Sequence, residues 1–275
     1  MMQEPDIGAM IFHHTADSHV IELPFVGEVR LPTGWTVFGV DVSPTRHVVF
    51  MAFAALLVLA TVWYAGRQVQ RRQREGKAPS GFGAAIEAIV LFVRNDIAIA
   101  NIGHNGAKFA PYVLSLFFFV LYCNLLGLFP WGATATGNIV VTGTLAILTF
   151  LIAEISGFFA LGPKGYLKTI VFVPPGMTGV GAVMMASIMT PIEIIGKLVK
   201  PFALCLRLFA NMTAGHFVIL ALLGLIFIFS SWAVAAGSVA FVLFMMLLEL
   251  LVAFLQAYIF ALLTSVFIGM MQHAH

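Results

Sequence analysis

The chain has 275 residues, of which 61% are hydrophobic and only 9% are charged, and its formal net charge is +2. Soluble domains carry about 25% charged residues, so this composition excludes an ordinary soluble domain and indicates an all-α integral membrane protein. No phosphate-binding loop, zinc-spaced Cys and His set, nucleophile elbow or nucleic-acid-binding signature occurs. We therefore expect a non-catalytic chain, not an enzyme, with no cofactor, no metal and no nucleic-acid partner.

Residues 1–45 form a polar tail rich in Pro and Gly, with six acidic residues against one arginine. The tail lacks the apolar core of a secretory signal, so we expect none. Its histidines, His13, His14 and His19, are compatible with a metal site, but we interpret them as solvated. Residues 46–275 form a single helical membrane domain in our interpretation.

Val48–Ala65 is an uncharged run of 18 residues, about the minimum for a spanning helix. A basic cluster follows it: Arg67, Arg71, Arg72, Arg74 and Lys77. The positive-inside rule makes this cluster cytoplasmic and places the tail, the N-terminus included, on the extracytoplasmic side. We expect segment 67–108 to be cytoplasmic.

Phe82–Gly103 carries Glu87, Arg94 and Asp96, too many charges for a spanning helix. Its apolar residues recur at helical spacing: Ile86, Ile89, Val90, Val93 and Ile97. Spacing leaves two interpretations open, a surface amphipathic helix lying on the cytoplasmic face of the membrane or a packed connector.

Phe109–Trp131 and Ile139–Leu161 are the next two predicted spans. Asn124 in the first is expected to hydrogen-bond a neighbouring helix, as polar residues commonly do in bilayers. Glu154 in the second either lines a water path or bonds a neighbouring helix. Lys164 then marks a return to the cytoplasm.

The last hundred residues contain two longer helical stretches. Thr178–Phe229 spans 52 residues, interrupted only by Pro191 and Pro201, and Gly237–Met271 spans 35. At 1.5 Å per residue these are roughly 78 Å and 52 Å long, against a hydrocarbon core of about 30 Å. We predict a steeply tilted hairpin over 178–272 that turns near residue 231. Five crossings put the C-terminus in the cytoplasm.

Polar residues are distributed along this hairpin. On the first helix four of them lie within about 80° of one another: Glu193, Lys200, Arg207 and Asn211. His216 points to the opposite side, about 13 Å beyond Arg207. On the second helix Glu249 and Gln256 are seven residues apart and share a face.

This pattern suits proton conduction, because carboxylates and His change protonation while Arg does not. A permanent cation blocks protons and attracts a passing carboxylate. Bland alternatives remain for each residue: Arg207 can be a snorkelling side chain, Glu249 a structural acid and His216 a packing residue.

The block Leu204-Cys-Leu-Arg207-Leu-Phe-Ala-Asn211-Met-Thr-Ala-Gly-His216 and the later Gln256-Ala-Tyr-Ile-Phe closely resemble subunit a of F-type ATP synthases. Other segments agree: Lys108-Phe-Ala-Pro111, Asn124-Leu-Leu-Gly-Leu-Phe-Pro130, Thr136-Gly-Asn138 with Thr142, Pro191-Ile-Glu193 and Lys200-Pro201. The resemblance covers about residues 45–272 and leaves the tail unexplained.

The resemblance implies that Arg207 faces the carboxylate of each c subunit as the rotor turns. His216 and Glu249 would line the outer half-channel, and Glu193 would lie near the inner one. Asn211 and Gln256 would be near the outer half-channel. Many bacterial members have an acid at the position of His216 and a His at that of Glu249, so this chain has the exchanged arrangement.

The implied function is a stator proton channel that drives rotation and ATP synthesis. The implied partners are the c-subunit ring, b-type peripheral-stalk subunits and membrane lipid, in a bacterial inner membrane or an equivalent energy-transducing membrane. The alternative is a stand-alone ion channel or secondary transporter. Transporters often show paired repeats with broken helices, and no such repeat is evident here.

Overall fold

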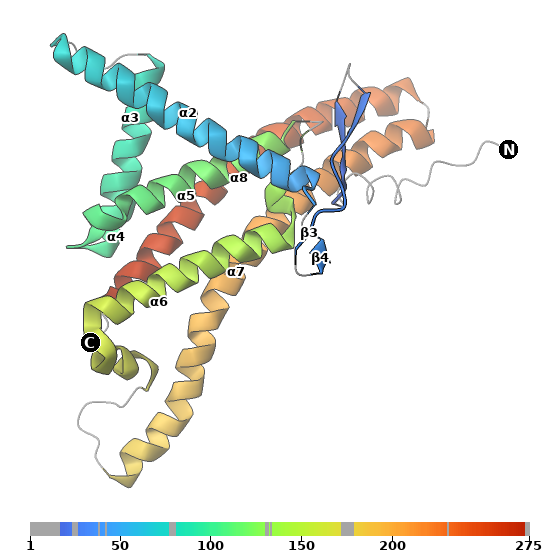
Figure 1. Cartoon of the computed structure of the whole chain (residues 1–275). Coiled ribbons are helices and arrows are strands. Elements are labelled where there is room, and N and C mark those ends of the chain that lie inside the picture. Colours follow the sequence, from blue (N-terminus) through green and yellow to red (C-terminus); the bar gives the residue numbers. More distant parts are fainter. Residues whose placement is uncertain are drawn as a thin grey trace.

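The computed structural model describes residues 17–23, 27–37, 39–41, 43–76, 81–129, 132, 134–171, 179–229 and 231–272. These residues are mostly helical, with two small β-hairpins near the N-terminus (Figure 1). Among them, five helices are long and apolar enough to cross a membrane. The prediction of an all-α integral membrane protein with about five spans is confirmed.

The polar tail is more ordered than its composition predicts. Two antiparallel hairpins form in it, strands β1 (Val20–Leu23) with β2 (Gly27–Arg30), and β3 (Thr36–Val37) with β4 (Val40–Asp41). We did not anticipate these strands, which are only two to four residues long. His13 and His14 lie outside the described residues, while His19 is half-buried.

The first span is α2 (Arg46–Arg74), whose 29 residues continue past the predicted apolar run. Gln and Arg are good helix formers, so the basic segment extends the helix instead of ending it. The hydroxyl of Thr61 lies 2.7 Å from that of Tyr122, which links α2 to the second span.

The connector after α2 is a nearly continuous helix of three parts: α3 (Phe82–Phe92), the π-helix η1 (Val93–Ile99) and α4 (Ala100–Ile102). Its apolar face, including Ile86 and Ile97, is buried against α2, α5 and α8. The predicted amphipathic helix is observed, with its apolar face packed against the bundle, and its position relative to a membrane stays a prediction.

The second and third spans are α5 (Gly106–Gly127) and α6 (Ile139–Ile170), joined through a short 3₁₀ turn, η2 (Ala135–Gly137). Asn138 caps α6 by accepting a hydrogen bond from Val140 N at 2.9 Å. At Gly162, φ is +69°, a left-handed conformation that suits glycine, and Pro163 follows. The chain changes direction there, directly after the predicted span ends.

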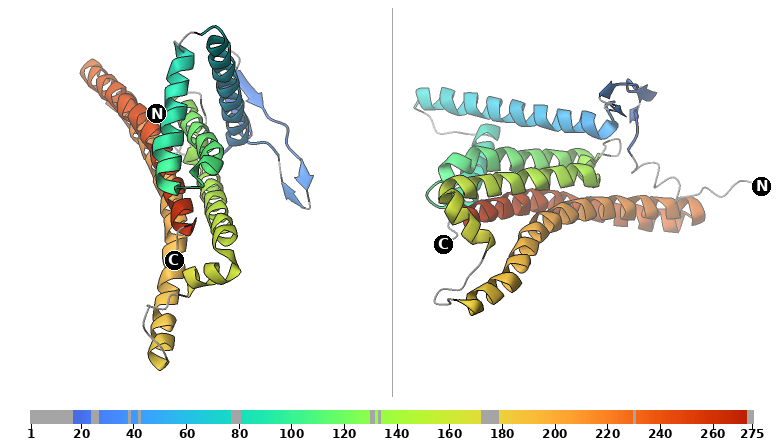
Figure 2. Two further views of the ribbon diagram at one scale, coloured as in Figure 1. Left: turned by 90° about the vertical axis from the view of Figure 1, so that its left-hand side faces the viewer. Right: turned by 60° about the horizontal axis from the view of Figure 1, so that its bottom comes forward.

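The hairpin consists of α7 (Val180–Phe229, 50 residues) and α8 (Trp232–Gln272, 41 residues). The expected interruptions at Pro191 and Pro201 are absent, because α7 continues through both. Prolines bend helices, and α7 curves along its length while α8 runs back beside it (Figure 2). The helices measure about 75 Å and 62 Å at 1.5 Å per residue, so the length prediction is confirmed, whereas the tilt in a bilayer stays a prediction.

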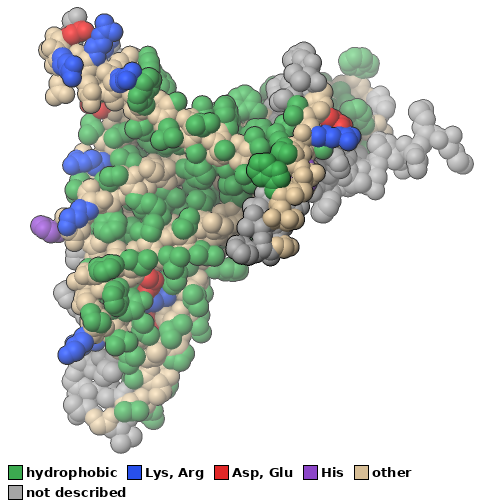
Figure 3. All heavy atoms as spheres, viewed as in Figure 1, with side chains coloured by type: hydrophobic (Ala, Val, Ile, Leu, Met, Phe, Trp, Pro, Cys, Tyr) green, Lys and Arg blue, Asp and Glu red, His purple; other side chains and the backbone are tan. Residues whose placement is uncertain are grey.

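The core centres on α5, which packs against α2, η1 and α8. Its largest fully buried side chains include Phe118, Phe260, Ile97 and Ile102. Most Lys and Arg side chains visible in Figure 3 gather at one end of the helices, around the C-terminal end of α2 and the α3–α4 connector. The spans thus share one basic end, as the positive-inside rule requires.

Candidate functional site

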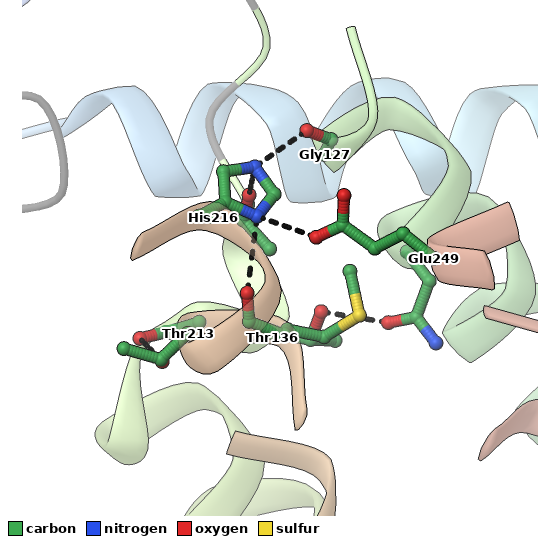
Figure 4. Close-up of polar contacts among 9 residues, drawn as sticks. Gly127, Thr136, Thr213, His216 and Glu249 are labelled. Carbon is green, nitrogen blue, oxygen red and sulfur yellow. Dashed lines mark hydrogen bonds and ion pairs between the residues drawn. The ribbon is translucent and has the colours of Figure 1, made fainter. Parts of the chain in front are cut away.

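His216 on α7 and Glu249 on α8 meet across the hairpin (Figure 4). The imidazole Nδ1 lies 3.0 Å from the carboxylate Oε1, and the side chains are only 24% and 5% exposed. The hairpin thus brings together the two titratable groups that we expect to line one half-channel. A buried carboxylate needs such a partner, because burying an isolated charge is costly.

Both nitrogens of His216 face oxygen atoms. Nδ1 lies 3.0 Å from Met212 O, and Nε2 lies 2.8 Å from Gly127 O and 2.8 Å from Thr134 Oγ1. Backbone carbonyls only accept hydrogen bonds, so each nitrogen can donate to a carbonyl when it carries a proton. The ring is held in place by α5, α7 and the turn before α6.

Gly215 makes room for this pair. A Cβ added at Gly215 would overlap the carboxylate of Glu249. Only glycine lacks that atom, so Glu249 can lie directly against the α7 backbone. The sequence analysis did not identify Gly215, and its one signal is that it immediately precedes His216.

A cavity of about 290 Å³ adjoins the pair. Its lining comes from five regions of the fold: the first residues of α2, the end of α5, the segment between α5 and α6, α7 from Met212 to Leu223, and α8 from Val242 to Glu249. We call it the outer cavity, because it lies at the ends of the helices opposite the basic cluster. His216, Glu249, Arg46 and His47 all line it.

Asn124 and Gln256 are buried beside this region. Asn124 Nδ2 donates to Ala253 O of α8 at 3.3 Å, and Thr136 Oγ1 donates to Asn124 Oδ1 at 2.7 Å. The predicted helix–helix hydrogen bond of Asn124 is therefore confirmed. Gln256 is 6% exposed, on the buried side of α8 with Glu249.

Arg207 lies on the opposite side of α7 from His216. The sequence predicts one face for Glu193, Lys200, Arg207 and Asn211, and all four are exposed. Within the described part of the chain, Arg207 has no acidic partner. A cation exposed in an apolar helix is costly in a bilayer unless a partner is supplied.

A second cavity, of about 280 Å³, lies between α6, α7 and α8 on the other side of Arg207. We call it the inner cavity. Glu154, Glu193, Lys197 and Lys200 line it. Glu154 accepts a hydrogen bond from Tyr166 of its own helix and pairs with Lys197 of α7, so the predicted contact with a neighbouring helix is observed, while the water path stays a prediction.

Lys197 is a contributor that the sequence analysis missed. Its Nζ lies 3.6 Å from Glu154 Oε2 and donates to Thr169 Oγ1 at 3.0 Å. The pair joins α6 to α7, with side chains 11% and 14% exposed. The available signal was the four-residue spacing from Glu193, which places Lys197 on the same side of the helix.

The two cavities contact different stretches of α7. The inner cavity reaches Glu193–Pro201, and the outer cavity reaches Met212–Leu223, so Arg207 lies between them. The arrangement defines a helical membrane protein with two separate cavities that contain ionisable side chains, and an exposed arginine between them.

Comparison with known proteins identifies the family to which the chain belongs. Residues 48–269 match the family model of the ATP synthase A chain, and the chain belongs to this family. It is 50% identical to the ATP synthase subunit a of Chloroherpeton thalassium over 258 residues, 94% of this chain and 75% of that protein.

Two further relatives agree. The chain is 48% identical to ATP synthase subunit a 2 of Chlorobaculum tepidum over 264 residues, 96% of this chain and 72% of that protein. It is 49% identical to the ATP synthase subunit a of Myxococcus xanthus over 240 residues, 86% of this chain and 76% of that protein. The resemblance seen in the sequence is thereby confirmed.

Proposed function

We propose that the chain is the stator proton channel of an F-type ATP synthase, with the outer and inner cavities as two offset half-channels. One observation carries the proposal: two cavities, each lined in part by ionisable side chains, meet α7 on either side of Arg207. Family membership makes the chain a membrane subunit of a hetero-oligomeric complex. The half-channel mechanism goes beyond family membership, and we propose it for this chain.

In the outer half-channel, water in the outer cavity delivers a proton to the His216–Glu249 pair. Each ring nitrogen of His216 has acceptors within 3.0 Å, and Glu249 is almost fully buried beside it. A proton can therefore enter at the imidazole and leave from the carboxylate toward the rotor. Gln256 and Asn211 do not line the outer cavity, and we assign them to the path from the pair toward the rotor.

Arg207 separates the two paths. Its guanidinium stays charged at any physiological pH, so protons cannot pass through it. A rotor carboxylate that reaches Arg207 is stabilised in its ionised form, because an opposite charge nearby favours ionisation. It loses its proton on the inner side and gains one on the outer side, so rotation is coupled to proton flow.

In the inner half-channel, Glu193 receives the released proton and the inner cavity carries it to the basic end of the bundle. Glu193 lines this cavity, about 21 Å along α7 from Arg207. Glu154 shares the same cavity. The chain makes and breaks no covalent bond, and ATP is formed by other subunits.

The exposed side of the hairpin fits the rotor. Large apolar side chains cover it on both helices, among them Ile192, Ile195, Leu243, Leu247 and Leu251. A ring of c subunits would bury this surface, and b-type stalk subunits and lipid would cover other helices. In a bacterial inner membrane the tail would face outward and the C-terminus the cytoplasm.

Purification of the intact complex through a tag on this chain tests the proposal. We expect copurification of a small, ring-forming membrane subunit and ATP-driven proton pumping after reconstitution. A chain that purifies alone and transports a solute would instead be a stand-alone channel or transporter.

A further inference from the structure

The N-terminal tail is attached to the start of α2, at the outer cavity. The backbone N–H of Arg46 donates to Ser18 O at 3.0 Å, and a His19 ring nitrogen lies 3.2 Å from Pro44 O. Ser43 Oγ accepts from the backbone N–H of Gly34 at 2.9 Å. These contacts fix Asp17 beside the first turn of α2.

Asp17 and His47 form a pair there. His47 Nε2 lies 3.7 Å from Asp17 Oδ1, and the exposed fractions of the side chains are 5% for His47 and 36% for Asp17. The carboxylate therefore reaches solvent while the imidazole is buried. The pair therefore connects the solvent-exposed surface, at Asp17, with the protein interior, at His47.

His47 also faces inward. It lines the outer cavity together with His216 and Glu249. Among the described residues, its Nδ1 has no hydrogen-bond partner although it is buried. Buried polar atoms are generally hydrogen-bonded, and the outer cavity of about 290 Å³, mostly apolar but lined also by Arg46, His216 and Glu249, has room for the water that would supply the bond.

We propose that Asp17 and His47 collect protons at the mouth of the outer half-channel and pass them to the His216–Glu249 pair. This inference rests on the proposed function and assigns the tail a part in it. A proton arriving at Asp17 moves through a bridging water to His47 Nε2, 3.7 Å away, and the imidazolium releases its Nδ1 proton to cavity water. One proton enters and one leaves, and exchange through water restores the starting tautomer.

Four charged or titratable groups set the behaviour of His47. Asp17 of the tail stabilises its cationic form, and Arg46, adjacent on α2, opposes it. His216 of α7 and Glu249 of α8 face the same cavity. The Asp17 carboxylate attracts protons to the mouth of the outer cavity, while the positive charge of Arg46 opposes their retention on His47. A site that passes protons on must not hold them tightly.

The test is passive proton uptake through the membrane sector of the complex, stripped of its soluble head, in right-side-out vesicles. A potassium diffusion potential, negative inside, drives the protons, and the outer pH is varied. The variants are His47→Gln and Asp17→Asn, with His19→Gln as a matched control on the same tail. His216→Leu reports on the relay itself.

We expect His47→Gln and Asp17→Asn to lower uptake several-fold at an outer pH of about 8 and little at about 6, values that bracket the ordinary histidine pKa of ~6.5. Free protons are scarce at the higher pH, so a collecting group matters most there. His19→Gln should match the unmodified chain, and His216→Leu should be slow throughout.

Two results overturn the inference in distinguishable ways. If His47→Gln and Asp17→Asn match the unmodified chain at every pH while His216→Leu is slow, the collecting role is wrong and the proposed channel stands. If His216→Leu also conducts normally, the proposed channel is wrong. Should His47→Gln not assemble, the pH profile of Asp17→Asn, whose side chain is partly solvated, decides alone.

Discussion

His216 Nδ1 and Glu249 Oε1 lie 3.0 Å apart, although 33 residues of chain and the hairpin turn separate them. Each is a titratable group in an apolar helix, and each is the ionisable partner that the other needs when it is buried. The two groups should therefore act together in proton transfer and not as independent residues.

We expect His216→Leu and Glu249→Leu to slow passive proton flux, because each removes a relay step and leaves its partner unpaired. The exchange His216→Glu with Glu249→His should recover part of the loss, since the composition of the pair is restored. A double-mutant cycle on head-stripped membranes measures the coupling. Simple additivity, with no recovery in the exchanged variant, would show that the residues act independently.

Arg207→Ala is expected to abolish ATP-driven proton pumping, and Arg207→Lys to restore little of it. Arg keeps its charge in an apolar setting, whereas Lys can lose its proton when desolvated. Pumping is measured in membrane vesicles, with the amount of assembled complex as the control. Normal coupled pumping by the alanine variant would contradict the role of this arginine.

Gly215→Ala should impair proton flux strongly, because the added Cβ overlaps the carboxylate of Glu249 and displaces it from His216. Gly181→Ala, on the same helix with open space around its Cβ position, is the matched control and should have no effect. Ala is the better helix former, so neither change should weaken the helix itself. Equal fluxes in the two variants would contradict the observed crowding.

Lys197→Met is expected to destabilise the complex more than the double variant Lys197→Met with Glu154→Gln. Removing one partner of a buried ion pair leaves an uncompensated charge and costs about 3–5 kcal/mol, whereas replacing both is far milder. Thermal stability of the purified complex measures the difference. A double variant less stable than the single one would mean that the pair itself holds α6 on α7.

The hairpin is expected to run far from the bilayer normal, because α7 and α8 are each about twice as long as the hydrocarbon core is thick. Accessibility of single cysteines to a membrane-impermeant reagent, introduced along both helices, gives the buried length. Long solvent-accessible ends on two upright helices would refute the tilt.

Much of the helical architecture follows from the sequence, because spanning segments must be long, apolar and internally hydrogen-bonded. Ile139–Leu161 ends directly before Gly162, where composition already predicts a stop. The β-hairpins of the tail are a different case. Their strands are too short for an alternating pattern, so pairing across the turn decides them.

The candidate site, too, could be predicted only in part from the sequence. Helical spacing predicted that Arg207 and His216 face opposite sides of α7, and the structure confirms it. The contact of His216 with Glu249 depends on how two helices are aligned along each other, which spacing within one helix does not contain. Lys197 and His47 were missed for the same reason, since Glu154 and Asp17 approach them from other elements.

Because Arg207 and His216 face opposite sides of α7, the number of residues between them is more tightly constrained than the identity of those residues. Nine residues separate them, two and a half turns of helix. A single inserted or deleted residue in 208–215 would rotate one group by about 100° relative to the other, turning either the arginine away from the rotor or the histidine away from Glu249. Single substitutions in this segment, Gly215 excepted, leave the relative orientation of the two groups unchanged, whereas any insertion or deletion alters it.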